Sequence, residues 1–315
     1  MIVDAVPAPR IIFMGTPEFA VPSLTALVDA GHSVVGVVTG PDKPRGRGQK
    51  LSPTPVKETA LRYNLPVLQP DSVKDLSLAE QVRMLGPDLA VVVAFRILPR
   101  EVFSLPRLGT FNLHASLLPK YRGAAPINWA IINGETETGV TTFFLEDRVD
   151  TGMMLVQERI PIEPDDDAGT IHDRLAVLGA MVVCRTVEQI ARGSARPVPQ
   201  DAGSATPAPK IFKEHCRIRW SQPAETVRNL IRGLSPTPGA WCLHGDRLLK
   251  IFRAKVGVPC GTVAPGALLV EGEEVSVMTA DRRLILLELQ QEGRRRMTSS
   301  EFLRGYPLHS GDVLS

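Results

Sequence analysis

Two short runs of residues that are apolar on both faces constrain the fold of this chain more than any other feature. They are SVVGVVT at 33–39 and DLAVVVAF at 88–95. A strand with one face in water alternates apolar and polar residues, whereas a strand covered on both faces does not. The two runs therefore predict central strands of a parallel sheet that lies between layers of helices.

Helical patterns alternate with strand patterns through about the first 190 residues. Further strands are expected at 10–14, 66–68, 109–114, 139–145 and 154–160, and a long helix at 168–192 begins after three acids that suit a helix N-terminus. The alternation predicts an α/β fold, namely an open, mostly parallel, Rossmann-like sheet with helices on both faces.

The pattern changes after 194–210, a stretch of Pro, Ala, Gly and Ser that is typical of a linker. Beyond it, one helix at 224–233 interrupts short strands, which predicts a small OB-like β-barrel. The expected strands are 217–220, 240–244, 247–254, 267–270, 274–278 and 284–289. Trp220 and Trp241 are expected in the barrel core, and the alternative is that they are platforms for base stacking. The predicted domains are 1–193 and 211–315, joined by the linker.

The net charge of +2 hides a difference between the two parts. Residues 1–202 carry 20 basic and 23 acidic side chains, whereas residues 203–315 carry 16 and 11, including Arg294, Arg295 and Arg296. This balance excludes a uniformly basic nucleic-acid coat protein. Four widely spaced cysteines predict reduced thiols and no metal site. Since no apolar run is long enough to span a bilayer, we expect a cytoplasmic protein with no membrane contact.

The segment GTFNLHASLLPKYRG at 109–123 contains the first candidate catalytic residues. If 110–114 is a strand, Asn112 and His114 share one face. An amide N–H can stabilise an oxyanion, and an imidazole can move a proton near neutral pH. The alternative is that both side chains only satisfy backbone groups in a loop.

A second candidate is Asp150, in the segment DRVDTG at 147–152 just after an expected strand. A carboxylate there can orient an imidazole, as the third member of an acid–base group does. The alternative is that Asp150 is only a turn residue.

Residues 40–57, GPDKPRGRGQKLSPTPVK, form a basic Gly/Pro-rich stretch. Lys43, Arg45, Arg47 and Lys50 suit phosphate contacts and, with the basic C-terminal domain, predict a surface for an RNA backbone. A solvated loop without a ligand is the alternative.

Five segments together resemble the folate-dependent formyltransferases, over the whole chain apart from about nine N-terminal residues. They are IIFMGTPEFAVPSL (11–24), PDKPRGRGQKLSPTPVK (41–57), FNLHASLLPKYRGAAPINWAIINGE (111–135), DRVDTGMML (147–155) and SPTPGAW (235–241). The central motifs are common to the family, whereas 41–57 and 235–241 are similar to its members that act on methionyl-tRNA.

The resemblance implies a role for each matching residue. Asn112, His114 and Asp150 become the catalytic residues, and Lys43, Arg45, Arg47 and Lys50 contact tRNA. Residues that bind the folate are Phe95, Arg96, Ile97, Leu98, Ser116, Leu117, Leu118, Pro119 and Val149. The chain departs from the family at Phe95-Arg96, where Tyr-Gly is usual, and at Arg148-Val149, where Gly-Leu is usual.

The resemblance also implies a reaction. A monomer transfers a formyl group from 10-formyltetrahydrofolate, a co-substrate, to the α-amino group of initiator methionyl-tRNA, and it holds no permanently bound cofactor and no metal. One alternative is a formyltransferase for a small amine such as an amino-sugar nucleotide or glycinamide ribonucleotide. Another is an RNA-binding module whose α/β half is inactive.

Overall fold

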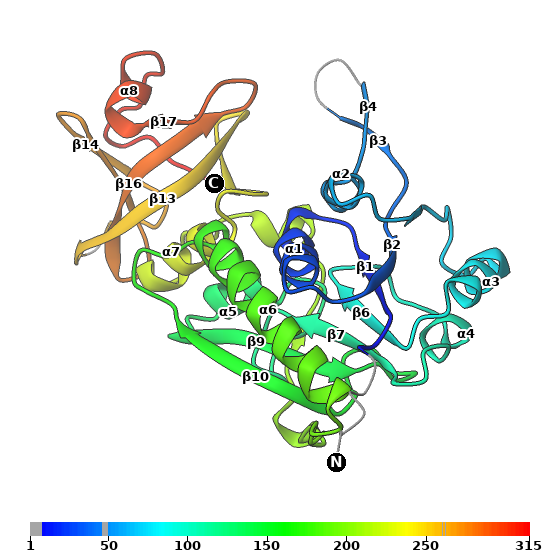
Figure 1. The fold of residues 1–315 in the computed structure, drawn as a ribbon. Helices are drawn as coiled ribbons and strands as arrows, with labels where there is room; N and C mark the ends of the chain where they lie inside the picture. The colour runs from blue at the N-terminus through cyan, green and yellow to red at the C-terminus, as the bar shows by residue number, and fades with distance from the viewer. Residues whose placement is uncertain (1–7, 46–49, 260, 262) are drawn as a thin grey trace. The chain divides into compact units, whose positions relative to one another are not determined.

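The computed structural model describes residues 8–45, 50–259, 261 and 263–315 (Figure 1). Its contacts divide the chain into two compact units made of interleaved segments. The α/β unit consists of the residues up to Gly123, Gly139–Ile160 and His172–Pro207. The β unit consists of Ala124–Thr138, Pro161–Ile171 and Ala208–Ser315. The predicted boundaries at 193 and 211 stay a prediction.

A seven-stranded sheet forms the centre of the α/β unit (Figure 1). In spatial order its strands are β10 (Met154–Pro161), β9 (Glu137–Phe144), β7 (Thr110–His114), β6 (Leu89–Val93), β1 (Ile11–Gly15), β2 (Val34–Val38) and β5 (Val67–Leu68). The five strands from β7 to β5 pair in parallel, and β9 is antiparallel to β7. The strand order reverses between β1 and β6, and ligands bind at the carboxyl ends of the strands beside such a point.

Helices pack on both faces of this sheet. Leu78 and Val102 share a buried cluster with Met14 and Val92 on one face. On the other face, a Cβ added at Gly179 would lie 2.5 Å from the Leu113 side chain. The helices are α1 (Val21–Asp29), α2 (Pro55–Arg62), α3 (Leu76–Leu85), α4 (Arg100–Phe103) and α6 (Ala168–Ala191). The predicted α/β fold class is confirmed, with the long helix within one residue of its expected end.

In the part of the chain that the structure describes, four short strands lie outside the two main sheets, in two pairs. β3 (Lys43–Arg45) and β4 (Lys50–Ser52) form an antiparallel hairpin that projects from the α/β unit in Figure 1. Two-residue strands occur at β8 (Arg122–Gly123) and β11 (Pro207–Ala208). Among the described residues, no helix is both long enough and apolar enough to cross a membrane.

The β unit is built on an antiparallel sheet. The strand order is β12 (Ala240–His244), β13 (Arg247–Pro259), β16 (Arg282–Gln291), β15 (Glu274–Met278) and β14 (Leu268–Glu271), and β17 (Met297–Thr298) pairs with β16. Its helices are α5 (Pro126–Ile132), α7 (Ala224–Gly233) and α8 (Ser299–Leu303). Residues 313 and 314 form isolated bridges with Ala267 and His244, beside or on the two edge strands of the sheet. The predicted second, β-rich domain is therefore confirmed as a fold class.

The strand expected at 217–220 is wrong. Only Arg217 forms a bridge, with Trp241. The backbone N–H of Gln222 then donates to the carbonyl of Arg219 at 3.1 Å, which closes a turn before α7. The turn leads directly to Pro223, the N-cap of that helix, so a turn and a helix take the place of a continuing strand.

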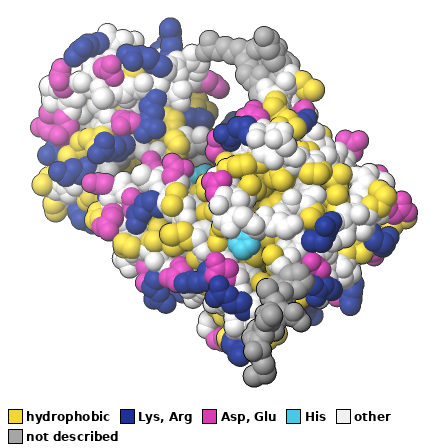
Figure 2. Space-filling model, in the orientation of Figure 1, with side chains coloured by type: hydrophobic (Ala, Val, Ile, Leu, Met, Phe, Trp, Pro, Cys, Tyr) yellow, Lys and Arg dark blue, Asp and Glu magenta, His cyan; other side chains and the backbone are white. Residues whose placement is uncertain are grey.

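Much of the basic charge of this unit is neutralised internally. Arg295 pairs with Glu301 at 3.1 Å, and Arg296 pairs with Glu288. The face drawn in Figure 2 accordingly shows Lys and Arg side chains interspersed with Asp and Glu. The run of three arginines is therefore no continuous positive surface by itself.

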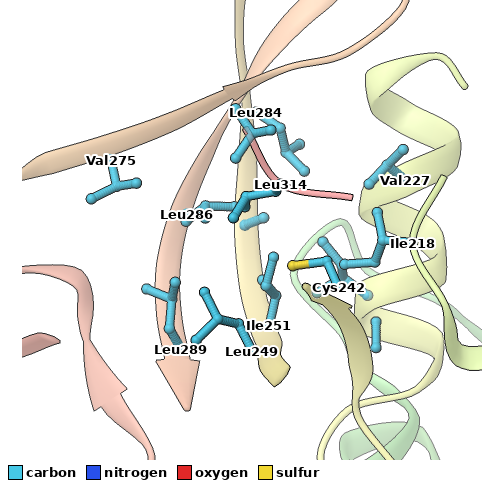
Figure 3. Close-up of a cluster of buried hydrophobic side chains, with 14 of the residues drawn as sticks. Ile218, Val227, Cys242, Leu249, Ile251, Val275, Leu284, Leu286, Leu289 and Leu314 are labelled. Carbon is cyan, nitrogen blue, oxygen red and sulfur yellow. The ribbon is translucent and has the colours of Figure 1, made fainter. Parts of the chain in front are cut away.

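Figure 3 shows the core of the β unit, into which Cys242, Leu249, Ile251 and Leu289 point. Trp220 is buried, as predicted. The prediction that Trp241 lies in the core is wrong, because Trp241 is only partly buried at its margin. Successive strand residues face opposite sides, so the inward position of Cys242 turns Trp241 outward.

Candidate active site

Asn112 and His114 lie at the carboxyl end of β7, on one face of the sheet. Asn112 is paired with Val92, which is itself paired with Met14, so these side chains share the face that α3 and α4 cover. The pairing of β7 with β6 ends at Leu113, so His114 lies at the ligand-binding edge. Among the described residues the half-buried side chain of Asn112 has no hydrogen-bond partner, which leaves its amide available to a ligand.

The orientation of the His114 imidazole is set by a backbone carbonyl. Nε2 lies 2.8 Å from the carbonyl oxygen of Tyr121, and the residue is 6% exposed. A carbonyl oxygen can only accept, so Nε2 carries the proton of this hydrogen bond. Nδ1 is therefore the nitrogen that is left for chemistry.

The carboxylate of Asp150 faces that nitrogen. Its Oδ2 lies 3.9 Å from Nδ1 of His114 and accepts a hydrogen bond of 2.8 Å from the backbone N–H of Gly123. A separation of 3.9 Å is too long for a direct hydrogen bond. A third atom can nevertheless lie within about 3 Å of both groups, so the pair defines a position for an incoming N–H group.

The backbone of the Asp150 turn is held from two sides. Asp150 has a φ of 55°, a left-handed conformation that is uncommon for a residue other than glycine. The side-chain amide of Gln200 donates to the carbonyls of Asp150 and Gly152 at 3.0 and 2.8 Å, while its oxygen accepts from Arg122. A Cβ added at Gly152 would lie 1.7 Å from the carbonyl oxygen of Phe144, so only glycine fits there.

The SLLP segment at 116–119 forms a fixed loop beside β7. The Thr141 hydroxyl donates to the carbonyl of Ser116 at 2.7 Å and accepts from the backbone N–H of Leu118, whose carbonyl accepts from Gln157. The side chains of Ser116 and Leu118 are buried, so folate could meet these two residues only through their backbone. The two members with partly exposed side chains are Leu117 and Pro119.

The segment after β6 carries the other predicted folate residues. The Arg96 guanidinium lies over the ring of Phe95 and donates to the carbonyls of residues 70 and 71, each at 2.8 Å. Arg96 therefore fastens the loop that follows β5 to the end of β6. Ile97 is 74% exposed, whereas Leu98 is buried.

A pocket of about 700 Å³ lies beside the Asp150 turn, within the α/β unit. Its wall includes Phe103, Arg148 and the ion pair between Arg100 and Asp147 at 2.9 Å. The neighbouring Val149 is 51% exposed. The turn therefore presents apolar and charged surface to solvent next to the catalytic candidates.

The basic hairpin is anchored at its base. Asp42 pairs with Lys57 at 2.7 Å and accepts from Gln69 at 2.7 Å. These two hydrogen bonds lower the pKa of the Asp42 carboxyl. Lys57 is thus engaged within the protein. Of the predicted tRNA residues, Lys43 is exposed, Arg45 and Lys50 end the paired strands, and Arg47 lies outside the described residues.

Three supporting residues were not predicted from the sequence, namely Tyr121, Thr141 and Gln200. Tyr121 acts through its carbonyl oxygen, which every residue type has, so its side chain gives no signal. Gln200 lies in a segment whose composition indicates a linker. Thr141 lies in the strand expected at 139–145. An inward-facing hydroxyl there, next to the strand that carries the catalytic candidates, is the sequence signal that could have indicated its role.

Within the described part of the chain, no three His, Cys, Asp or Glu side chains are grouped so that they could hold a metal ion. The family model described as formyl transferase matches residues 9–187, and the model of its C-terminal domain matches 210–307. The chain is also similar in fold to the N-formyltransferase from Helicobacter canadensis, solved with folinic acid and dTDP-3-aminofucose. That match has a TM-score of 0.68 and 19% identity and covers 90% of this chain and 99% of the other. Fold and site together define a formyltransferase.

Relatives that match along nearly the whole chain identify the kind of formyltransferase more closely. The chain is 50% identical to the methionyl-tRNA formyltransferase of Bacteroides fragilis over 309 residues, which covers 95% of both chains. It is also 50% identical to that of Caldanaerobacter subterraneus over 307 residues, which covers 97% of this chain and 99% of the other. The chain belongs to the methionyl-tRNA formyltransferase family.

Proposed function

We propose that this chain transfers the formyl group of 10-formyltetrahydrofolate to the α-amino group of initiator methionyl-tRNA, which gives N-formylmethionyl-tRNA. The observation that carries the proposal is the arrangement of three groups at one sheet edge: the free amide of Asn112, Nδ1 of His114 and the carboxylate of Asp150. Full-length similarity to methionyl-tRNA formyltransferases supports the choice of acceptor.

The reaction begins when the neutral α-amine attacks the formyl carbon. An α-amino group with a pKa of about 8 is partly neutral at pH 7. The new C–N bond converts the formyl oxygen to an oxyanion, which the amide of Asn112 stabilises by donating a hydrogen bond, as does Nδ1 of His114 once it has received the proton of the amine. The amine nitrogen then loses a proton, assisted by Asp150, to Nδ1 of His114, and the bond from the formyl carbon to N10 of the folate breaks as N10 takes that same proton from His114.

Folate and tRNA are assigned to different elements. Residues 95–98, 116–119 and Val149 surround the edge where Asn112 and His114 end, and we assign the pterin to them by resemblance. Lys43, Arg45, Arg47 and Lys50 of the basic hairpin are assigned to tRNA phosphates. We further expect a monomer that acts in the cytoplasm and binds the folate only as a co-substrate.

The proposal is tested by measuring formyl transfer from 10-formyltetrahydrofolate to three acceptors: methionyl initiator tRNA, an amino-sugar nucleotide and glycinamide ribonucleotide. We expect turnover with the first acceptor and none with the other two. Turnover confined to a small amine would replace the proposed acceptor, and tRNA binding without folate turnover would indicate an inactive α/β unit.

The basic hairpin gives a prediction for substrate binding. Arg47→Ala should raise KM for methionyl-tRNA by roughly tenfold, because a cationic phosphate contact is lost. The KM for 10-formyltetrahydrofolate should stay within twofold of the parent value. Arg83→Ala, which removes an exposed arginine from α3, serves as the control and should change neither constant. A loss of folate affinity with unchanged tRNA affinity would show that the hairpin has been assigned to the wrong substrate.

A further inference from the structure

The β unit has a pocket of about 470 Å³ that the proposed reaction does not use. Three of its lining residues form one row across three neighbouring strands. Trp241 of β12 is paired with Lys250 of β13, and Lys250 is paired with Gln290 of β16. An aromatic ring, an ammonium group and a carboxamide are thus aligned on a single sheet face.

The row lies on the opposite side of the sheet from the core. Cys242, Leu249 and Leu289, the sequence neighbours of the three residues, point into the buried cluster in Figure 3. Because strand residues alternate between faces, the row points outward. All three side chains are partly exposed, and the Lys250 ammonium, which donates one hydrogen bond to the carbonyl of Pro238 at 2.8 Å, keeps further N–H donors for a ligand. In OB-type domains a sheet face of this kind binds nucleic acid.

Two further cationic side chains lie close to the ring of Trp241. Nζ of Lys213 and the guanidinium carbon of Arg217 lie 5.7 and 5.6 Å from the ring centre of Trp241. Nε1 of the indole donates to the carbonyl of Lys213 at 3.0 Å, which fixes the ring. Neither cation forms a salt bridge with any residue that the structure describes. Cation–π contacts at exposed sites are weak, so an incoming base can displace one of the cations.

The charges around the pocket define an orientation for an anionic ligand. Lys213 and Arg217 lie beside the Trp241 ring, and Lys250 is next to Trp241 in the row. Glu292, another lining residue, is exposed. A phosphate is attracted to the first group and repelled by the carboxylate, whereas a base amino group can donate to that carboxylate.

We propose that this pocket binds one unstacked nucleotide of the tRNA substrate, with its base on Trp241 and its phosphate between Lys213 and Lys250. The inference rests on the proposed function, since it takes tRNA as the partner. Base stacking on an aromatic ring combined with cationic groups is the usual way in which proteins hold an unpaired nucleotide. Arg295 and Arg296, by contrast, are engaged by carboxylates.

The test measures binding of uncharged initiator tRNA to the full chain at two salt concentrations. Trp241→Ala should weaken binding about tenfold, as expected for one lost base stack. Lys250→Gln should weaken it about fivefold and lower the salt dependence by about one phosphate contact. Trp241→Phe should recover most of the affinity, because phenylalanine keeps a stacking face. Lys255→Gln removes an exposed charge of the same strand outside the pocket and should leave binding unchanged.

Steady-state kinetics provide a second measurement. The two pocket variants should raise KM for methionyl-tRNA while kcat and KM for 10-formyltetrahydrofolate stay within twofold of the parent values. A merely structural role for Trp241 would instead lower the melting temperature and kcat, and Trp241→Phe would not restore affinity selectively. That result would overturn the proposal.

The remaining outcomes are distinguishable from failure of the proposed function. If the parent chain binds tRNA but does not formylate it, the proposed function is wrong. The tRNA affinities of the pocket variants then still show whether the pocket binds a nucleotide. If the parent formylates tRNA and both Trp241→Ala and Lys250→Gln bind tRNA within twofold of it, the pocket proposal is wrong. Adenosine monophosphate that binds in the pocket should quench the fluorescence of Trp241. If this quenching persists at saturating tRNA, the pocket binds a free nucleotide, and the proposal is overturned.

Discussion

Asn112→Ala and His114→Ala should each lower kcat for formyl transfer by about 100- to 1,000-fold, the range found when one preorganised oxyanion donor is removed. Asn112 offers an amide that no described residue engages, so its hydrogen bond to the oxyanion forms without first breaking another. His114 is held through Nε2, so Nδ1 meets the substrate in a fixed direction. Both variants should keep the melting temperature within a few degrees, because neither residue is a large apolar core side chain.

The measurement is kcat with both substrates saturating, accompanied by thermal unfolding of each variant. Asn112→Asp is the most selective variant, because it keeps the shape of the side chain but replaces the N–H donor by a carboxylate oxygen. It should lose at least as much activity as Asn112→Ala. His309→Ala, which removes an exposed histidine from the β unit, is the matched control and should be as active as the parent chain. If Asn112→Ala and His114→Ala both keep more than a tenth of the parent kcat, the catalytic assignment is wrong.

The sequence predicts the strands around this site because their signal is local. The runs at 33–39 and 88–95 become β2 and β6 within the parallel sheet, and alternation along β7 puts Asn112 and His114 on one face. Asp150 could be proposed as a partner because it follows an expected strand. Its approach to His114 depends on the Gly123 N–H and on Gln200, which are 27 and 50 residues away in the chain.

The parts that the sequence does not predict depend on distant contacts. Residues 124–138 and 161–171 belong to the compact unit that the C-terminal residues form, although composition places them in the first domain. Within that unit the side-chain amide of Asn128 donates to the carbonyl of Gly233 at 2.7 Å, more than a hundred residues along the chain. The outward position of Trp241 was missed for a related reason, since large aromatic residues are usually buried and only the pairing register shows which face they take.

Gly152→Ala should destabilise the fold by about 3 kcal/mol, the upper range for forcing extra volume into a packed interior, and should also lower kcat. The added Cβ would lie 1.7 Å from the carbonyl oxygen of Phe144 and 2.9 Å from its carbonyl carbon. Both atoms belong to backbone of β9, whose adjacent residue Phe143 pairs with Asn112. The clash cannot be relieved by rotating a side chain, so the strand or the turn has to move.

Loss of activity is expected together with loss of stability, because the shift acts on the turn that holds Asp150. The carbonyls of Asp150 and Gly152 both accept from the Gln200 amide, so displacing one disturbs the other and lengthens the 3.9 Å separation between Asp150 Oδ2 and His114 Nδ1. Gly305→Ala is the matched control, since nothing lies within 4 Å of its added Cβ, and its stability should change by less than about 0.5 kcal/mol. The free energy of unfolding in urea and kcat, measured on the same preparations, test both expected losses. A Gly152→Ala variant with the stability and kcat of the parent would mean that β9 and the Asp150 turn do not approach as closely as the structure places them.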